Sequence, residues 1–172
     1  MEMWDVYDKD RKLTGKQMRR GDAFEQGDFH LVIHVCLFNQ QGEMLIQQRQ
    51  PNKDHWQNMW DLTVGGSALA GETSQQAAER EVEEEIGLVL NLQKLRPSVT
   101  VNFEYGFDDY YVSEIDVDLR KLPLPTEEVS QVKWAAKDAI FHLISEGQFI
   151  PYHESLISLL FDTRHMIGAH KN

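Results

Sequence analysis

A helix with clear signals at both ends constrains this chain more than any other segment. Thr73 and Gln76 form the Thr-x-x-Gln pattern of a capping box, which satisfies the free N–H groups at the start of a helix. Apolar residues then recur every four positions and form one narrow stripe: Ala78, Val82 and Ile86. Gly87 follows where a C-cap glycine belongs. We therefore predict an amphipathic helix over residues 73–86 that buries one side.

Short apolar segments on both sides of this helix predict strands. They are Trp4–Tyr7, Phe29–Phe38, Met44–Gln48, Asp61–Val64, Ser98–Tyr105, Tyr110–Val117 and Val132–Trp134. The polar residues 39–42 predict a hairpin between the second and third of these, and Gly65-Gly66 is expected to close the fourth. Residues Lys137–Ser145 and Glu154–Ile167 predict two further amphipathic helices. This order predicts a mixed sheet with helices on its faces.

Composition excludes several classes of function. The chain has 172 residues, with 17 Lys and Arg against 28 Asp and Glu, for a net charge of −11. Such an acidic chain is poorly suited to a nucleic acid backbone or an anionic membrane surface. The single cysteine, Cys36, excludes an internal disulfide or a thiolate zinc cluster. The segment Met1–Asp10 is acidic, so we expect no signal peptide and a cytoplasmic protein of one domain, residues 1–172.

Acidic residues crowd the end of the predicted helix. At 100° per residue, Glu81, Glu84 and Glu85 share a face, whereas Glu83 points away. Three like charges this close repel one another, and a hard divalent cation such as Mg²⁺ or Mn²⁺ would remove the conflict. Arg80 could pair with one carboxylate and fix its orientation. For an isolated helix, the alternative is a solvated acidic face.

The surrounding spacing favours the metal site. From Gly66 there are five residues to Glu72, seven more to Arg80-Glu81, and then Val82-x-Glu84-Glu85-x-Gly87-Leu88. Residues 66–88 thus resemble the Nudix box, Gly-x5-Glu-x7-Arg-Glu-U-x-Glu-Glu-x-Gly-U, where U is a bulky aliphatic residue. Every specified position matches.

The resemblance implies a fold and a reaction. Nudix domains are α/β/α sandwiches with a mixed sheet, and they hydrolyse a pyrophosphate bond in nucleoside diphosphates linked to another group. By position, Glu81, Glu84 and Glu85, with a backbone carbonyl near Gly66, would bind Mg²⁺, with Mn²⁺ as a substitute. Glu72 and Arg80 would support them. The implied partner is a small-molecule diphosphate, and a homodimer would be in keeping with a family in which dimers are common.

The upstream segment narrows the resemblance. Residues Leu45–Arg49, Lys53, Trp56 and Trp60 resemble the isopentenyl diphosphate isomerase branch of the superfamily. Arg49 and Lys53 match residues that contact diphosphate there, although both could be ordinary surface charges. His30 matches a metal-ligating histidine of the isomerases, although His30 and His34 could equally be buried, hydrogen-bonded residues of one strand face.

This chain lacks two residues that the isomerases use. The isomerases carry a cysteine just before the box glycine and a histidine just after it, where this chain has Gly65 and Ser67. Cys36 lies mid-strand and is expected in the core. We therefore predict a Nudix pyrophosphohydrolase related to the isomerases. Isomerase-like activity and a non-catalytic nucleotide-binding module are the alternatives.

The general base is not identified by the motif. Some family members use a carboxylate outside the box for this step. Glu127 and Glu128, in the loop before the predicted strand 132–134, are candidates for it, and the alternative is two exposed loop acids.

Overall fold

The computed structural model describes residues 2–166 and 168–170. Its strands are β1 Met3–Tyr7, β2 Leu13–Arg19, β3 His30–Phe38, β4 Met44–Arg49, β5 Trp60–Asp61, β6 Val64–Ser67, β7 Val99–Phe103, β8 Gly106–Glu114 and β9 Val129–Ala135. Its α-helices are α1 Ser74–Ile86, α2 Lys137–Ser145 and α3 Glu154–Thr163. A short 3₁₀ helix spans Leu119–Lys121. No helix in these ranges is both long and apolar enough to cross a bilayer.

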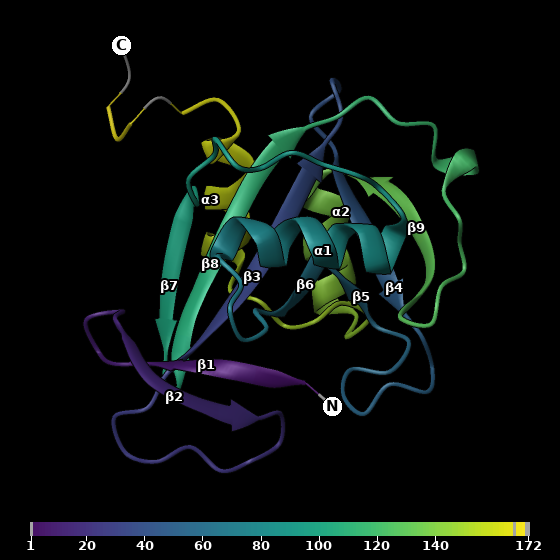
Figure 1. The fold of residues 1–172 in the computed structure, drawn as a ribbon. Helices are drawn as coiled ribbons and strands as arrows, with labels where there is room; N and C mark the ends of the chain where they lie inside the picture. Colours follow the sequence, from purple (N-terminus) through teal and green to yellow (C-terminus); the bar gives the residue numbers. More distant parts are fainter. Residues whose placement is uncertain (1, 167, 171–172) are drawn as a thin grey trace.

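The molecule has three layers, with α1 on one face of the central sheet and α2 and α3 on the other (Figure 1). Alternate residues of β3 enter the two cores, because successive side chains of a strand point to opposite faces. Ile33 and Val35 pack with Val82 and Ile86 of α1. On the opposite face, residues including Cys36 and Phe38 pack with Ile140 of α2 and Leu160 of α3. The predicted α/β/α sandwich is confirmed.

The central sheet is mixed, as predicted. Its strand order is β5-β4-β3-β8-β7, with β6 also pairing with β3 and β9 with β4. The pair β3–β8 is parallel, and the other pairs are antiparallel. Strand β3 is therefore central and almost wholly buried, which explains its continuous apolar sequence.

The predicted hairpin between residues 29–38 and 44–48 is wrong in most of its length. Strands β3 and β4 pair only at Phe38 and Met44 and then separate. Strand β6 takes the remaining edge of β3, and β9 pairs along the length of β4. Local turn signals could not reveal these partners, which are distant in the sequence.

The sequence suggested that Gly65 and Gly66 close a strand, but the structure shows that they do not. They lie inside β6, paired with His34 and Ile33 of β3. A Cβ atom on Gly65 would lie 2.6 Å from Cδ2 of His34, and one on Gly66 would lie 2.2 Å from Oε1 of Glu81. Side chains from both faces therefore occupy the space beside this strand, and glycine is required for packing rather than for a turn.

Several other elements also differ from the predictions. Strand β8 begins at Gly106 rather than at 110, because its polar residues Asp108 and Asp109 are neutralised by partners from other elements. Strand β2 was not predicted, because it is polar and largely exposed. Helix α3 ends at Thr163. Ile167, its predicted last residue, lies outside the described residues.

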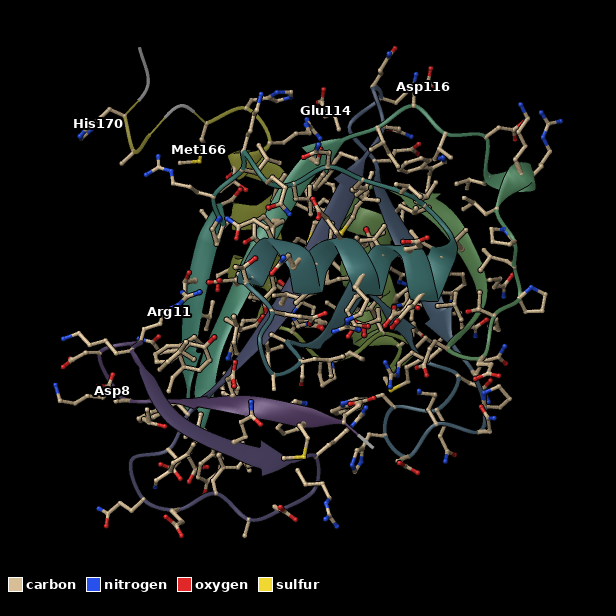
Figure 2. The ribbon with its side chains drawn as sticks, in the orientation of Figure 1. Asp8, Arg11, Glu114, Asp116, Met166 and His170 are labelled. Carbon is tan, nitrogen blue, oxygen red and sulfur yellow. The ribbon has the colours of Figure 1, made fainter. Side chains whose placement is uncertain are left out.

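The hairpin of β1 and β2 crosses one end of the molecule (Figure 1). Arg11 lies at its turn (Figure 2) and donates through Nη1 to Oδ1 of Asp109 on β8, at 2.9 Å. Asp109 is fully buried and also accepts from the hydroxyls of Ser74 and Thr100. A buried carboxylate with a cationic partner and two hydroxyl donors holds the hairpin to the sheet and to the start of α1.

Candidate active site

Helix α1 and the loop before it form as the sequence predicts. The capping box is complete: the Thr73 hydroxyl accepts from the Gln76 N–H, and the Gln76 side chain accepts from the Thr73 N–H at 2.9 Å. Gly87 ends the helix in the left-handed conformation at φ 70°. Val82 and Ile86 are fully buried, which fixes the rotation of the helix. The carboxylate of Glu81, one residue before Val82, consequently lies against Gly66 of β6.

Arg80 connects the loop to the acidic residues. Its Nε donates to Oε1 of Glu72 at 2.7 Å, and its Nη2 donates to Oε2 of Glu72 at 3.0 Å. Nη2 also donates to the backbone oxygen of Ser67, while Nη1 donates to Glu81 at 2.9 Å and to Glu84 at 3.0 Å. Burial acts to raise the pKa of Glu72, but Arg80 and the Leu69 N–H lower this pKa by more. The predicted supporting role of Arg80 and Glu72 thus has a definite geometry.

The three carboxylates of the predicted cluster have different surroundings. Glu81 is largely buried, and burial raises its pKa although Arg80 opposes this. Glu85 is 5% exposed and accepts from Nε2 of Gln47 at 2.6 Å. Burial, followed by the negative charge of Glu81, raises the pKa of Glu85 well above its ordinary value. Glu84 is exposed apart from its contact with Arg80.

The oxygen atoms of these carboxylates are suitable ligands for a hard divalent cation. Over residues 2–166 and 168–170, no three Asp, Glu, His or Cys side chains stand close enough together to hold an ion without moving. The Glu81 carboxylate lies against Gly66, where the missing Cβ leaves the backbone accessible. Because Glu81 raises the pKa of Glu85, a cation between them would remove a real repulsion. Glu84 is exposed and contacts Arg80, the same residue that contacts Glu81.

A pocket of about 1070 Å³ contains the predicted phosphate contacts. Its lining residues are Trp4, Arg20, Gly21, Arg49, Gln50, Asn52, Lys53, Asp54, His55, Thr126, Glu127 and Glu128. Lys53 forms an ion pair with Glu128, and Nη1 of Arg49 lies 3.8 Å from Asp61. The Thr126 hydroxyl donates to the backbone oxygen of Glu85 at 2.9 Å. The pocket therefore borders the acidic end of α1.

His34 is partly buried and hydrogen-bonded, as the structural interpretation of this residue requires. His30 is buried, but its Nδ1 atom has no hydrogen-bond partner among residues 2–166 and 168–170, so the interpretation as a hydrogen-bonded residue is not confirmed for His30. Nδ1 of His34 lies 2.8 Å from Asp108, and Nε2 lies 3.2 Å from the Tyr152 hydroxyl. His30 packs on Trp4, and burial lowers its pKa to about 4. Cys36 is fully buried, which raises the pKa of its thiol.

Some residues around the site were missed by the sequence analysis. Gln47 holds Glu85 but stands in a strand whose alternation gave no sign of a polar contact. Trp4 and Arg20 come from a hairpin far from the box in the sequence. Only the tertiary structure places them beside Arg49 and Lys53.

Comparison with known proteins agrees with this fold and gives the family. Residues 28–157 match the model of the NUDIX domain. An uncharacterized Nudix hydrolase of Listeria monocytogenes is 47% identical over 170 residues, covering 99% of both chains. An isopentenyl-diphosphate Delta-isomerase of Halorhodospira halophila is 27% identical, covering 79% of this chain and 81% of its own. The crystal structure of DR0079 from Deinococcus radiodurans superposes with a TM-score of 0.74 at 23% identity, covering 94% of this chain and 99% of that one.

The family match, together with a mixed-sheet sandwich whose capped helix places Glu81 against Gly66, identifies the class of this protein as a hydrolase. The chain belongs to the Nudix family. It is a Nudix pyrophosphohydrolase with more distant isomerase relatives.

Proposed function

We propose that this protein is a Mg²⁺-dependent hydrolase that cleaves the pyrophosphate bond of a nucleoside diphosphate linked to another group. Glu81, Glu84 and Glu85, with the backbone at Gly66, would hold the ion, and Mn²⁺ could substitute. One observation carries the proposal: the Glu81 carboxylate lies against Gly66 while the buried Glu85 borders a pocket that contains Arg49 and Lys53.

The residues of the chain have separate tasks in this reaction. Arg49 and Lys53 bind the diphosphate and orient it toward the acidic end of α1. Arg80 and Glu72 keep the Glu81 carboxylate against Gly66, and Gln47 keeps Glu85 in place. When bound, the ion lowers the pKa of water and offsets negative charge on the phosphoryl oxygens. Glu127 and Glu128 line the pocket, and one of them acting as the base stays a prediction.

Hydrolysis is favoured over isomerisation by the surroundings of Gly65. The isomerase resemblance would need a cysteine there, but the ring of His34 lies 2.6 Å from the position of the added Cβ atom. His34 is held on both ring nitrogens, by Asp108 and Tyr152. A cysteine would therefore require a rearrangement of a buried hydrogen-bonded group.

The test measures release of phosphate or pyrophosphate from a panel of nucleoside diphosphates, triphosphates and ADP-ribose. We expect turnover with Mg²⁺ or Mn²⁺ and none with excess EDTA. Glu81→Gln and Glu85→Gln should each lower kcat by about 10²–10³-fold, the loss typical of one essential electrostatic contact. Glu83→Gln is the control, because Glu83 is exposed on another side of the same helix. Full activity in both site variants would contradict the proposal, and binding without turnover would favour the non-catalytic alternative.

We also infer that residues 1–172 form one domain that includes the box at 66–88. The two helical layers share the central sheet, which supports this. A homodimer and a cytoplasmic location stay predictions. Sedimentation of the purified chain would test the former.

A further inference from the structure

The pocket beside the acidic residues has a wall that the family's sequence motif does not describe. Trp4, Arg20 and Gly21 line it together with Arg49 and Lys53. These first three residues lie in or next to the β1–β2 hairpin, before the start of the matched NUDIX range at residue 28. Figure 1 shows this hairpin beneath α1, with the start of β1 nearest the loop between β4 and β5.

Two hydrogen bonds fix the hairpin to the loop between β6 and α1. The N–H of Ala70 donates to the backbone oxygen of Met3 at 2.8 Å. The N–H of Gly71 donates to Oδ2 of Asp5 at 2.7 Å. Both donors lie in the loop that leads from β6 into α1. The hairpin wall therefore has a defined position relative to the carboxylates, as a specificity element requires.

Trp4 presents an unsatisfied donor at this wall. Its side chain is buried and stacks on His30 with 4.5 Å between ring centroids. Its Nε1 atom is buried but has no hydrogen-bond partner among residues 2–166 and 168–170. A buried N–H group without a partner is rare and costs stability. Trp4 also lines the pocket, so an acceptor oxygen on a ligand there would supply the missing partner once the indole ring shifts to expose Nε1.

Arg20 adds positive charge to the same wall. Its only ion pair among the described residues joins its Nη1 to Glu2 at 2.9 Å, and both side chains are largely exposed. An exposed pair of this kind contributes little stability, so an anionic ligand can replace Glu2 at small cost. Arg20 joins Arg49 and Lys53 around this pocket. The lining also carries Asp54, Glu127 and Glu128, and Glu128 pairs with Lys53.

We propose that Trp4 and Arg20 bind the anionic, acceptor-rich group linked to the diphosphate and so determine which substrate is chosen. The inference rests on the proposed function, since it assigns substrate contacts to the hairpin side of the pocket that contains Arg49 and Lys53. It predicts a substrate with a further phosphoryl or similarly charged oxygen-rich group at the hairpin side. Trp4 would donate its N–H to such a group, and Arg20 would pair with its charge.

The experiment compares kcat and KM of the wild type, Trp4→Phe, Arg20→Gln and Arg19→Gln on the same Mg²⁺-containing panel. Arg19 is the matched control, because it lies in the same hairpin but not at the pocket. We expect Arg20→Gln to raise KM for the best substrate about tenfold, as loss of a charge-assisted contact does. Trp4→Phe keeps an aromatic ring and should raise KM about fivefold, with kcat nearly unchanged in both variants. The preference order among panel compounds should also change.

The outcomes separate this inference from the proposed function. A wild type that turns over none of the compounds would contradict the proposed function, and calorimetric titration with ATP and ADP-ribose would then measure the same differences as Kd. An active wild type with unchanged KM values in both Arg20→Gln and Trp4→Phe would overturn only the hairpin assignment. If Trp4→Phe unfolds, the comparison of Arg20→Gln with Arg19→Gln decides. Equal losses in those two variants would also overturn it.

Discussion

Replacing Gly66 with Ala adds one carbon atom at the most crowded point of the candidate site. The new Cβ atom would lie 2.2 Å from Oε1 and 2.3 Å from Cδ of Glu81. Non-bonded carbon atoms prefer a separation of about 3.5–4.0 Å, so the carboxylate must move by about 1 Å or more. The Glu81 carboxylate is the end of a flexible side chain, and the backbone of β6 can stay in place.

This displacement should lower the activity strongly and the folding stability only slightly. Misplacing a catalytic group by about 1 Å can lower the rate about 10²-fold, which is the loss of kcat expected for Gly66→Ala. The cost in folding is at most one weakened contact between Glu81 and Arg80, about 1 kcal/mol, or about 2–4 °C in Tm.

The assay pairs steady-state kinetics at saturating Mg²⁺ with calorimetric unfolding. Ser67→Ala is the control, because it alters the adjacent residue of the same strand. Activity of Gly66→Ala within about twofold of the wild type would refute the argument that Glu81 must stay against the backbone at Gly66. Lost activity accompanied by global unfolding would refute the claim that the methyl group acts locally.

Three further predictions concern stability. Gly65→Cys should cost about 1–3 kcal/mol in thermal unfolding, because its Cβ atom would overlap the ring of His34. Arg11→Gln should cost about 2–3 kcal/mol in urea unfolding, because the carboxylate of Asp109 stays buried with only hydroxyl donors. Burial lowers the pKa of His30 to about 4 from 6.5, so the unfolded chain takes up a proton first as the pH falls between these values. Stability should therefore fall across this window by about 2 kcal/mol after allowance for solvent screening, as measured by urea unfolding at each pH.

Matched variants test these three predictions. Ser67→Cys adds a thiol in the same strand and should leave Tm nearly unchanged. Lys9→Gln removes the cation of an exposed pair with Asp10 in the same turn, and it should leave stability unchanged. His30→Phe removes the titrating group while keeping an aromatic ring, so the fall in stability between pH 6.5 and 4 should be smaller. Equal behaviour of a variant and its control would show that the buried contact in question does not carry the effect.

The sequence by itself determined the elements whose signals are local. Helix α1 follows from the Thr73 capping box, its apolar stripe and Gly87, which act within a few residues of one another. The sequence likewise predicted that Arg80 could pair with a carboxylate, and its contact with Glu84 follows from helix geometry, because residues four positions apart lie on one face. The helix spans and most strand positions followed from hydrophobic periodicity in the same way.

The tertiary structure alone decided which distant segments meet. Strand β3 pairs with β4 only at Phe38 and Met44, and β6 and β8, which are distant in the sequence, take its two edges. Gly65 and Gly66 look like a turn in the sequence, yet they are small because His34 and Glu81 approach them from opposite sides of β6. Trp4 and Arg20 reach the pocket only through the docking of the hairpin. Which distant segments pair depends on the free energy of the whole packed chain, and this cannot be read from any short segment of the sequence.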